Sequence, residues 1–336
     1  ASFKSYQYFD TFSQESILVR TDKNEVYASH DGGAHFRKVE TDGEDILEIN
    51  FNPFFNTTAY LFGKNKNLYS TADRAVTFST TKLPEGRQLG FPLSFHAKDP
   101  KTFIYYGGEN CDSFFDPKCH AVAYITKDGG QSFDRLLEGA LSCEFIESAV
   151  SNPRVENGIT CLVKDKSSGK RNFVTSSDYF KTQTVLYPDA LGFMTTGDYL
   201  VVAVPHGERQ LRAYFTVDGV DYSEAILPKD LESYEQKAFT ILGSQEGAIF
   251  MHMTTNLHKN QEFGALLKSN TEGTSFVILE RAVNRNYLGF VDFEKIQGIE
   301  GIILVNVVSN VAEIVDSDNA QTEKKIKTKI TFNDGA

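Results

Sequence analysis

A short turn motif recurs along the chain and constrains its fold more than any other feature. The segment from Ser29 to Phe36 reads Ser-His-Asp-Gly-Gly-Ala-His-Phe, and the segment from Thr126 to Phe133 reads Thr-Lys-Asp-Gly-Gly-Gln-Ser-Phe. Both follow the frame Ser/Thr-x-Asp-x-Gly-x-x-aromatic, which we call the box motif. A motif repeated at this length indicates a repeat architecture rather than a single irregular domain.

Five further segments keep part of the box motif, each with its own departure. The copy at Thr71 lacks only the glycine, and the copy at Ser176 lacks both the glycine and the aromatic residue. The copy at Thr216 has its aromatic residue one position early, and the copy at Ser269 lacks the aspartate. A last copy begins at Thr331. The positions to which we assign a structural role are Ser29, Asp31, Gly33, Phe36, Thr71, Asp73, Phe78, Thr126, Asp128, Gly130, Phe133, Ser176, Asp178, Thr216, Asp218, Ser269, Gly273 and Phe276.

The spacing of the copies predicts the fold class. They begin at positions 29, 71, 126, 176, 216, 269 and 331, so six intervals cover 302 residues (331 − 29), or about 50 residues each. A strand-rich repeat of about 40–50 residues is typical of a propeller blade. We therefore predict an all-β chain, a β-propeller of four-stranded blades in which each box motif forms a turn. The segment Leu231–Lys237 is the one place where we expect a short helix.

The chemistry of the motif explains why it would form a turn. The aspartate can accept hydrogen bonds from backbone N–H groups a few residues later. The glycine supplies a positive φ at little steric cost. Apolar runs such as Val26-Tyr27-Ala28 precede the motif, so a strand enters the turn and another leaves it. We expect the aromatic residue of each copy to return to the core.

The composition argues against a nucleic-acid ligand and against a membrane span within these residues. There are 34 basic and 45 acidic residues, a net charge of −11, which argues against a nucleic-acid ligand. The lysines between Lys324 and Lys329 are better explained as the solvent face of an alternating strand than as a basic patch. There is no tryptophan, against 27 Phe and 15 Tyr, so the aromatic core consists of single rings. No apolar run has the ~18–20 residues that cross a bilayer.

The cysteines and one asparagine indicate the secretory pathway. Cys111 and Cys119 are separated by seven residues, and Cys143 and Cys161 by seventeen, without the C-x-x-C spacing of zinc sites. Two local disulfides in an oxidising compartment are the favoured interpretation, and a metal site that includes His120 is the alternative. Asn56-Thr57-Thr58 is an N-glycosylation sequon in a turn-like stretch.

Several stretches outside the box motifs help to identify the family. They are Ser94-Phe95-His96, Asp99-Pro100, Asn110-Cys111, Cys119, Cys143-Glu-Phe145, Phe250-Met-His252, Leu267-Lys-Ser269-Asn and Lys329–Gly335. Box turns occur in sialidases, in some glucan-cleaving hydrolases and in the sortilin-type vacuolar protein sorting receptors, and with these flanking stretches the chain resembles the sortilin-type receptors.

The resemblance implies a receptor module in the lumen. Propellers of this family have ten blades, so the chain would cover about six to seven blades of one module, 1–336, truncated on its C-terminal side. Such receptors capture soluble vacuolar or lysosomal hydrolases, such as carboxypeptidase Y-like cargo, in the late Golgi for delivery to the endosome. A membrane span and a cytosolic tail that binds a sorting coat would lie outside these residues. A fungal tandem receptor is the expected source, and neither a cofactor nor a metal is expected.

One position departs from the family pattern. In the family, a basic residue shortly after an Asp-Phe stretch anchors the terminal carboxylate of the ligand. The matching stretch here begins at Asp292-Phe293 and places Glu300 at that position. Because an acid repels a carboxylate, the site is not transferred to this chain. The ligand-binding residues therefore stay unknown: a cargo would either bind another surface or present a basic or neutral group at this spot.

The alternative is a glycoside hydrolase on the same fold. Sialidases use an Arg-Ile-Pro run, three arginines and a Tyr–Glu pair, and no such run occurs here. Glucan hydrolases stack sugars on tryptophan, which the chain lacks. We therefore predict a binding module and not an enzyme.

The aspartates of the box motifs are not expected to bind calcium. They lie one to a blade, whereas a calcium ion takes six to eight oxygen ligands.

Overall fold

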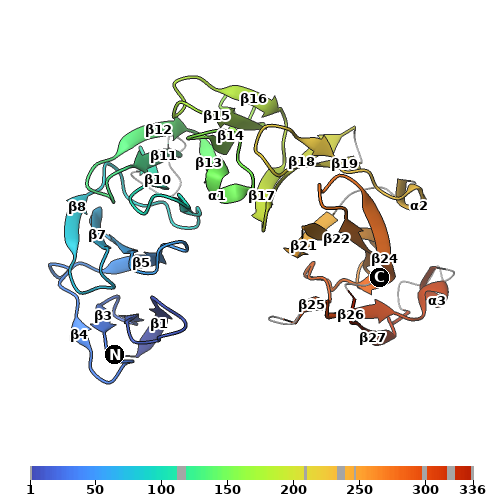
Figure 1. Ribbon diagram of the computed structural model, residues 1–336, viewed down its shortest axis with the longest axis horizontal. Helices are drawn as coiled ribbons and strands as arrows, with labels where there is room; N and C mark the ends of the chain where they lie inside the picture. Colours follow the sequence, from blue (N-terminus) through green and yellow to red (C-terminus); the bar gives the residue numbers. More distant parts are fainter. Residues whose placement is uncertain are drawn as a thin grey trace. The chain divides into compact units, whose positions relative to one another are not determined.

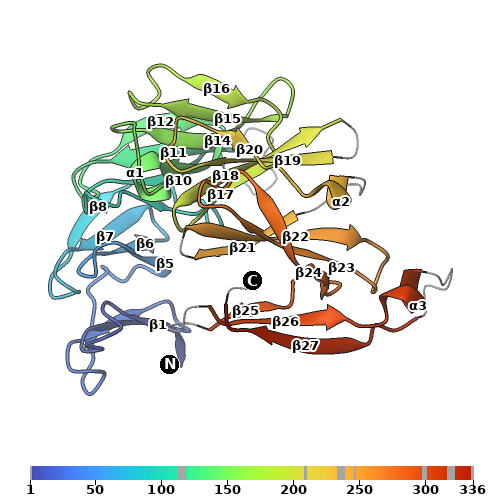
Figure 2. The ribbon, with the colours of Figure 1, turned by 45° about the vertical axis from the view of Figure 1, so that its right-hand side comes forward.

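Successive antiparallel strands pair in chain order within each four-stranded sheet of the computed structural model (Figures 1 and 2). The structure describes residues 2–111, 119–207, 210–232, 239–245, 247–296, 301–315 and 322–333. These form two compact units: unit 1 contains residues 1–148 and 156–186, and unit 2 contains residues 149–155 and 187–336.

Four blades make up most of unit 1, and each is a sheet of four sequential strands. The first contains β1 (Phe3–Tyr8), β2 (Ile17–Thr21), β3 (Val26–Ser29) and β4 (Arg37–Lys38). The second contains β5 (Ile46–Phe51), β6 (Ala59–Gly63), β7 (Asn67–Thr71) and β8 (Ser79–Lys82). The third contains β9 (Ser94–Phe95), β10 (Phe103–Glu109), β11 (His120–Thr126) and β12 (Asp134–Glu138). The fourth contains β13 (Ala140–Phe145), β14 (Ile159–Lys164), β15 (Arg171–Ser176) and β16 (Thr184–Tyr187).

Unit 2 continues the same pattern with one larger sheet. The fifth blade contains β17 (Gly192–Thr196), β18 (Tyr199–His206), β19 (Gln210–Thr216) and β20 (Ser223–Glu224). The sixth contains β21 (Phe239–Gln245), β22 (Ala248–Asn256), β23 (Phe263–Ser269) and β24 (Phe276–Asn284). A further group contains β25 (Phe293–Lys295), β26 (Ile303–Val308) and β27 (Ile326–Thr331). It joins the sixth blade through the pair Val283 and Val307 on β24 and β26.

Within the part of the chain that the structure describes, helices are confined to single turns. They are α1 (Ile146–Ala149), α2 (Lys229–Glu232) and α3 (Val311–Val315). The helix expected over Leu231–Lys237 begins two residues earlier, and residues 233–238 lie outside the described part of the chain. The predicted all-β fold of four-stranded blades is confirmed. Among the described residues, no helix has the length and apolar character needed to cross a membrane.

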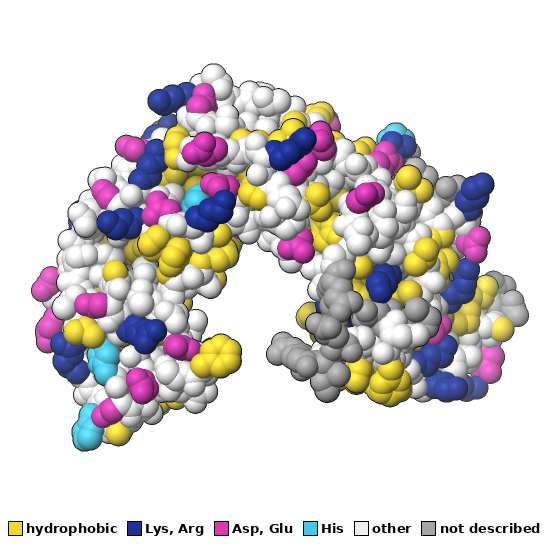
Figure 3. Space-filling view, in the orientation of Figure 1, with side chains coloured by type: hydrophobic (Ala, Val, Ile, Leu, Met, Phe, Trp, Pro, Cys, Tyr) yellow, Lys and Arg dark blue, Asp and Glu magenta, His cyan; other side chains and the backbone are white. Residues whose placement is uncertain are grey.

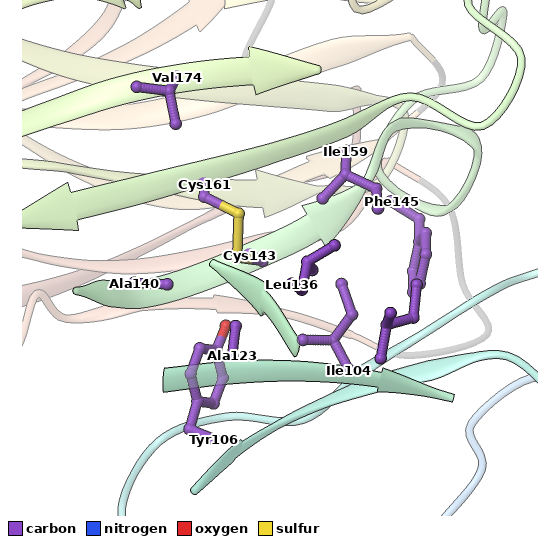
Figure 4. Packing of buried hydrophobic residues seen from close by; sticks show 11 residues of the cluster. Ile104, Tyr106, Ala123, Leu136, Ala140, Cys143, Phe145, Ile159, Cys161 and Val174 are labelled. Carbon is purple, nitrogen blue, oxygen red and sulfur yellow. A yellow bond between two sulfur atoms is a disulfide. The ribbon is translucent and has the colours of Figure 1, made fainter. Parts of the chain in front are cut away.

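The core of each unit lies between neighbouring blades, because the inner strands are continuous apolar runs that must be covered on both faces. Strands such as β6 are buried along their whole length because both faces of an inner strand meet another blade. Single rings fill these layers: Tyr60 lies 4.4 Å from Phe103, and Tyr105 stacks on Tyr124 at 5.4 Å between centroids. The layer between the third and fourth blades encloses the disulfide between Cys143 and Cys161 (Figure 4).

The strands of the sixth blade approach one another so closely at Gly264 that a side chain has no space there. A Cβ on Gly264 would overlap the Met253 carbonyl oxygen and would lie 2.7 Å from His252 Cε1. We expect Gly264→Ala to lower the free energy of unfolding by about 2–3 kcal/mol, because the backbone must move. Gly192→Ala on β17 is the matched control, since a Cβ there meets nothing within 4 Å. Urea unfolding measures both, and equal midpoints for the two variants would contradict the steric argument.

Candidate functional site

The aspartates of the box motifs form one recurring hydrogen-bond pattern. In five copies the hydroxyl of the first residue donates to the carboxylate two residues later, at 2.8 Å in the first four and 3.1 Å in the fifth. The pairs are Ser29–Asp31, Thr71–Asp73, Thr126–Asp128, Ser176–Asp178 and Thr216–Asp218. The same hydroxyl accepts an N–H three or four residues after its own position, at 2.9 Å. Each turn is therefore closed from both sides.

The backbone conformation of the fifth position explains why glycine recurs in the motif. Gly33 and Gly130 have φ of 96° and 90°, in the left-handed region. Ala75 and Phe180 replace glycine in two copies and still adopt φ of 68° and 60°. A side chain in this region costs conformational energy, so the hydrogen bonds of the turn hold these two residues in place.

The copy that lacks aspartate has a substitute one residue earlier. Asn270 Oδ1 accepts hydrogen bonds from the N–H groups of Thr274 at 2.9 Å and Ser275 at 3.1 Å. Ser269 Oγ accepts the Ile249 N–H at 2.8 Å. The box motif does not identify Asn270, because it requires a carboxylate two residues after the hydroxyl residue and Asn270 is an amide one residue after Ser269. An amide oxygen next to the hydroxyl residue is the signal that could have found it.

The aromatic positions differ in burial. Phe276 is 5% exposed, and Phe133 packs edge-on against Tyr105 at 5.1 Å. Phe36 is 39% exposed and contacts Phe3 at 5.8 Å, so the expectation that every aromatic returns to the core is wrong for this copy. The strand β4 that follows Phe36 has only two residues, both exposed, and does not bury it.

Hydrogen bonds keep the aspartates of the turns ionised. The Thr182 N–H, together with the hydroxyls of Thr182 and Ser176, lowers the pKa of Asp178 to about 2. The His35 N–H and side chain likewise lower the pKa of Asp31. Among the described residues no three His, Cys, Asp or Glu side chains form a group that could hold a metal ion. The carboxylates bind their own backbone, as an Asx-type turn does.

The four cysteines form two disulfides. Cys111 bonds to Cys119, and Cys143 bonds to Cys161 across directly paired positions of β13 and β14. The predicted disulfides are confirmed, and the alternative of a metal site fails because bonded sulfurs are not thiolate ligands. His120 instead lies 3.0 Å from a carboxylate oxygen of Glu138.

Two carboxyl groups lie between the third and fourth blades in different surroundings. Glu144 on β13 is largely buried and accepts the Ser94 hydroxyl at 3.1 Å. Burial raises the pKa of Glu144 to about 7. Glu147 meets Lys98 Nζ at 2.9 Å and His96 Nε2 at 3.0 Å. The Lys98 ammonium lowers the pKa of Glu147, so two acids three residues apart in the sequence are shifted in opposite directions.

The stretch that the sequence analysis matched to the family's carboxylate site lies on unit 2. Asp292 accepts the side-chain amides of Asn284 at 2.8 Å and Asn306 at 3.1 Å. A groove of about 290 Å³ beside β25 is lined by Asp292, Phe293 and Glu294, among others. Phe293 packs on Phe250 with 5.6 Å between ring centroids. Glu300 lies outside the described residues.

The surface combines both charges with exposed apolar groups. On the face in Figure 3, acidic and basic side chains are interspersed, and hydrophobic side chains lie between them. Asn56 is exposed in the turn between β5 and β6. A surface of this kind suits recognition of proteins and peptides better than a phosphate backbone.

Four-stranded blades closed by carboxylate turns place the chain in the β-propeller class of proteins. The chain belongs to the Sortilin-Vps10 family, described as "Sortilin, neurotensin receptor 3", whose pattern matches residues 24–336. The expected relationship to sortilin-type receptors is therefore confirmed. At the level of fold alone, the chain is similar to an uncharacterized protein of Listeria monocytogenes. The TM-score is 0.51 with 11% identity, over 92% of each chain.

Curated relatives define the relationship more closely. The chain is 76% identical to vacuolar protein sorting/targeting protein 10 of Kluyveromyces lactis, over 99% of this chain and 21% of that protein. It is 50% identical to an uncharacterized membrane glycoprotein of Saccharomyces cerevisiae, over 99% of this chain and 30% of that protein. The chain thus spans about a fifth to a third of the length of these relatives. The first is named for sorting and targeting, in agreement with the prediction of a non-enzyme.

The box turns should contribute to stability rather than to ligand contacts. Asp128 accepts the N–H groups of Gln131 and Ser132, both at 2.9 Å. We expect Asp128→Ala to cost about 1–2 kcal/mol and to lower the unfolding temperature by a few degrees. Asp134→Ala, an exposed position on β12, is the control. Loss of ligand binding by Asp128→Ala without a change in thermal unfolding would assign the aspartate a different role.

Glu144 should make stability depend on pH. Because the pKa of Glu144 is raised in the folded state, the folded protein binds more protons than the unfolded chain between about pH 4.5 and 7. The stabilisation that comes from the protonated Glu144 carboxyl is thus present at low pH and is lost as the pH rises through 7. We expect Glu144→Gln to increase stability at pH 8 by about 2 kcal/mol and to change little at pH 4.5.

The control for this pH dependence is Glu156→Gln, an exposed acid of the same unit. Urea unfolding between pH 4.5 and 8 measures both variants. A Glu144→Gln curve parallel to the wild-type curve would show that the buried carboxyl does not titrate in this range.

Proposed function

We propose that this chain is a luminal cargo-binding module of a vacuolar sorting receptor. The observation that carries the proposal is its 76% identity, over 99% of its length, to a protein named for vacuolar sorting and targeting. In this proposal both units belong to one propeller module within residues 1–336. The receptor would capture soluble vacuolar hydrolases of the carboxypeptidase Y type in the late Golgi and deliver them to the endosome.

The two disulfides support placement in an oxidising lumen. A relative named as a membrane glycoprotein supports attachment of the receptor to the membrane. A cytosolic coat would then bind the receptor through a tail on the other side of the membrane. These steps belong to the whole receptor, and the chain contributes recognition of the cargo.

The chemistry of the β25 groove indicates which cargo segment it would accept. Glu294 is exposed on β25, and the carboxylate of Asp292 lines the same groove. The chain as a whole has a net charge of −11. Acidic groups attract basic segments and slow the approach of acidic ones. We therefore propose that the groove takes a basic or neutral segment of the cargo and not a free carboxylate.

Capture of a purified carboxypeptidase Y-type precursor at pH 7 and pH 5 tests this function. We expect binding at neutral pH and a loss of at least tenfold in affinity for Glu294→Lys. Glu272→Lys is the matched control, because Glu272 is also an exposed acid of unit 2 but lies in a box turn. Absence of binding at both pH values would reject the sorting function, and equal binding by the two variants would reject the β25 groove alone.

A further inference from the structure

A second groove, with a volume of about 660 Å³, lies on unit 1 between the loop after β1 and the loop after β5. Phe9 and Phe51 in its wall pack edge-on at 4.9 Å between centroids. Phe12 and Phe54, which also line it, are 98% and 45% exposed. Exposed aromatic rings around a groove of this size are typical of a binding site, because their burial is favourable.

The sequon asparagine is part of the same groove. The Thr58 N–H donates to the Phe55 carbonyl at 3.2 Å, so Asn56 and Thr57 occupy the middle of a tight turn. Arg74 Nη2 donates to Asn56 Oδ1 at 3.3 Å. Asn56 Nδ2, the atom to which an N-linked sugar is attached, has no hydrogen bond to the described residues. The turn thus presents the acceptor nitrogen while its oxygen is held.

An aromatic ring precedes the asparagine at a fixed distance in the chain. Phe54 lies two residues before Asn56, and its N–H donates to Asn52 Oδ1 at 2.9 Å, which fixes the backbone at the start of the turn. A pyranose ring has one face made largely of C–H groups, and this face can pack on an aromatic ring and remove both from water. The sequence Phe-x-Asn-x-Thr therefore combines a sugar acceptor with an aromatic surface.

The groove also contains a polar group that needs a partner. Asn52 is 4% exposed and lines the groove, and its Nδ2 has no hydrogen-bond acceptor among the described residues. Buried donors in folded proteins are almost always hydrogen-bonded. Asn52 Nδ2 is itself shielded from solvent, so the surface that the groove offers to a sugar is formed by the exposed rings of Phe12 and Phe54.

We propose that Asn56 carries an N-linked glycan whose first N-acetylglucosamine packs on Phe54 and whose following sugars cover Phe12. The occupant is the chain's own glycan because its attachment point is in the wall of the groove. A tethered sugar has a high effective concentration there, which a free peptide of equal affinity does not have. The glycan is then a structural part of the first two blades.

The experiment compares three forms of the chain produced in a yeast secretory host. Thr58→Ser keeps the sequon, Thr58→Ala removes it, and trimming with an endoglycosidase leaves one N-acetylglucosamine on Asn56. Mass spectrometry of the peptide that contains Asn56 measures occupancy. We expect the wild-type and Thr58→Ser forms to be glycosylated, and the trimmed form to keep the unfolding temperature of the untrimmed form because the first sugar makes the contact with Phe54.

Coupling between the ring and the sugar is measured by adding Phe54→Ser to the glycosylated and the Thr58→Ala forms. We expect Phe54→Ser to lower the unfolding temperature of the glycosylated form by about 2 °C more than that of the Thr58→Ala form. Phe290→Ser, at a 67% exposed ring in unit 2, is the control and should shift both forms equally.

Three outcomes would overturn the proposal. The first is an unoccupied Asn56 in the secreted chain. The second is an equal effect of Phe54→Ser in both forms, which would leave the ring and the sugar independent. The third is binding of a phenylalanine-containing peptide that requires Phe12 and Phe54 and has the same Kd with and without the glycan, which would make the groove a peptide site.

Discussion

The hydrogen bond between a serine or threonine hydroxyl and the aspartate two residues later is the interaction on which the blades depend. It holds two consecutive residues in the left-handed region, where even Ala75 and Phe180 are found. The turn then sets the register of the third and fourth strands of a blade. A slip of one residue would turn every buried side chain of those strands to the wrong face. Each hydrogen bond is weak by itself, but because it fixes the strand register it determines which apolar side chains of the blade are buried.

The sequence predicted the features that depend on local chemistry. The box motifs placed the turns after β3, β7, β11, β15 and β19, because hydroxyl, carboxylate and left-handed residue act within eight positions. The apolar runs before them placed the inner strands. The cysteine spacing favoured local disulfides, since each pair bridges a short loop or one hairpin.

The sequence could not predict features that depend on packing between distant segments. The raised pKa of Glu144 results from burial between two blades, and its partner Ser94 lies 50 positions earlier. The exposure of Phe36 depends on the shortness of β4, which the motif does not encode. The groove at Phe12 and Phe54 joins two loops, and neither loop has a signal that identifies the other. In the β25 groove, Asp292 and Phe293 belong to the stretch that the resemblance matched to the family's carboxylate site, and the sequence analysis did not transfer that site to this chain.

The outer strands of the blades have a consequence for the behaviour of the protein in concentrated solution. β4 and β20 have two residues each, and β27, which is longer, has the exposed lysines Lys327 and Lys329. A short edge offers few free amides to a second chain, and a lysine on an edge would have to lose its hydration if another strand were added. These edge strands are therefore poor templates for the addition of a strand from a second chain, which is the step that starts aggregation. A protein built almost entirely of strands can thus remain dispersed at high protein concentration.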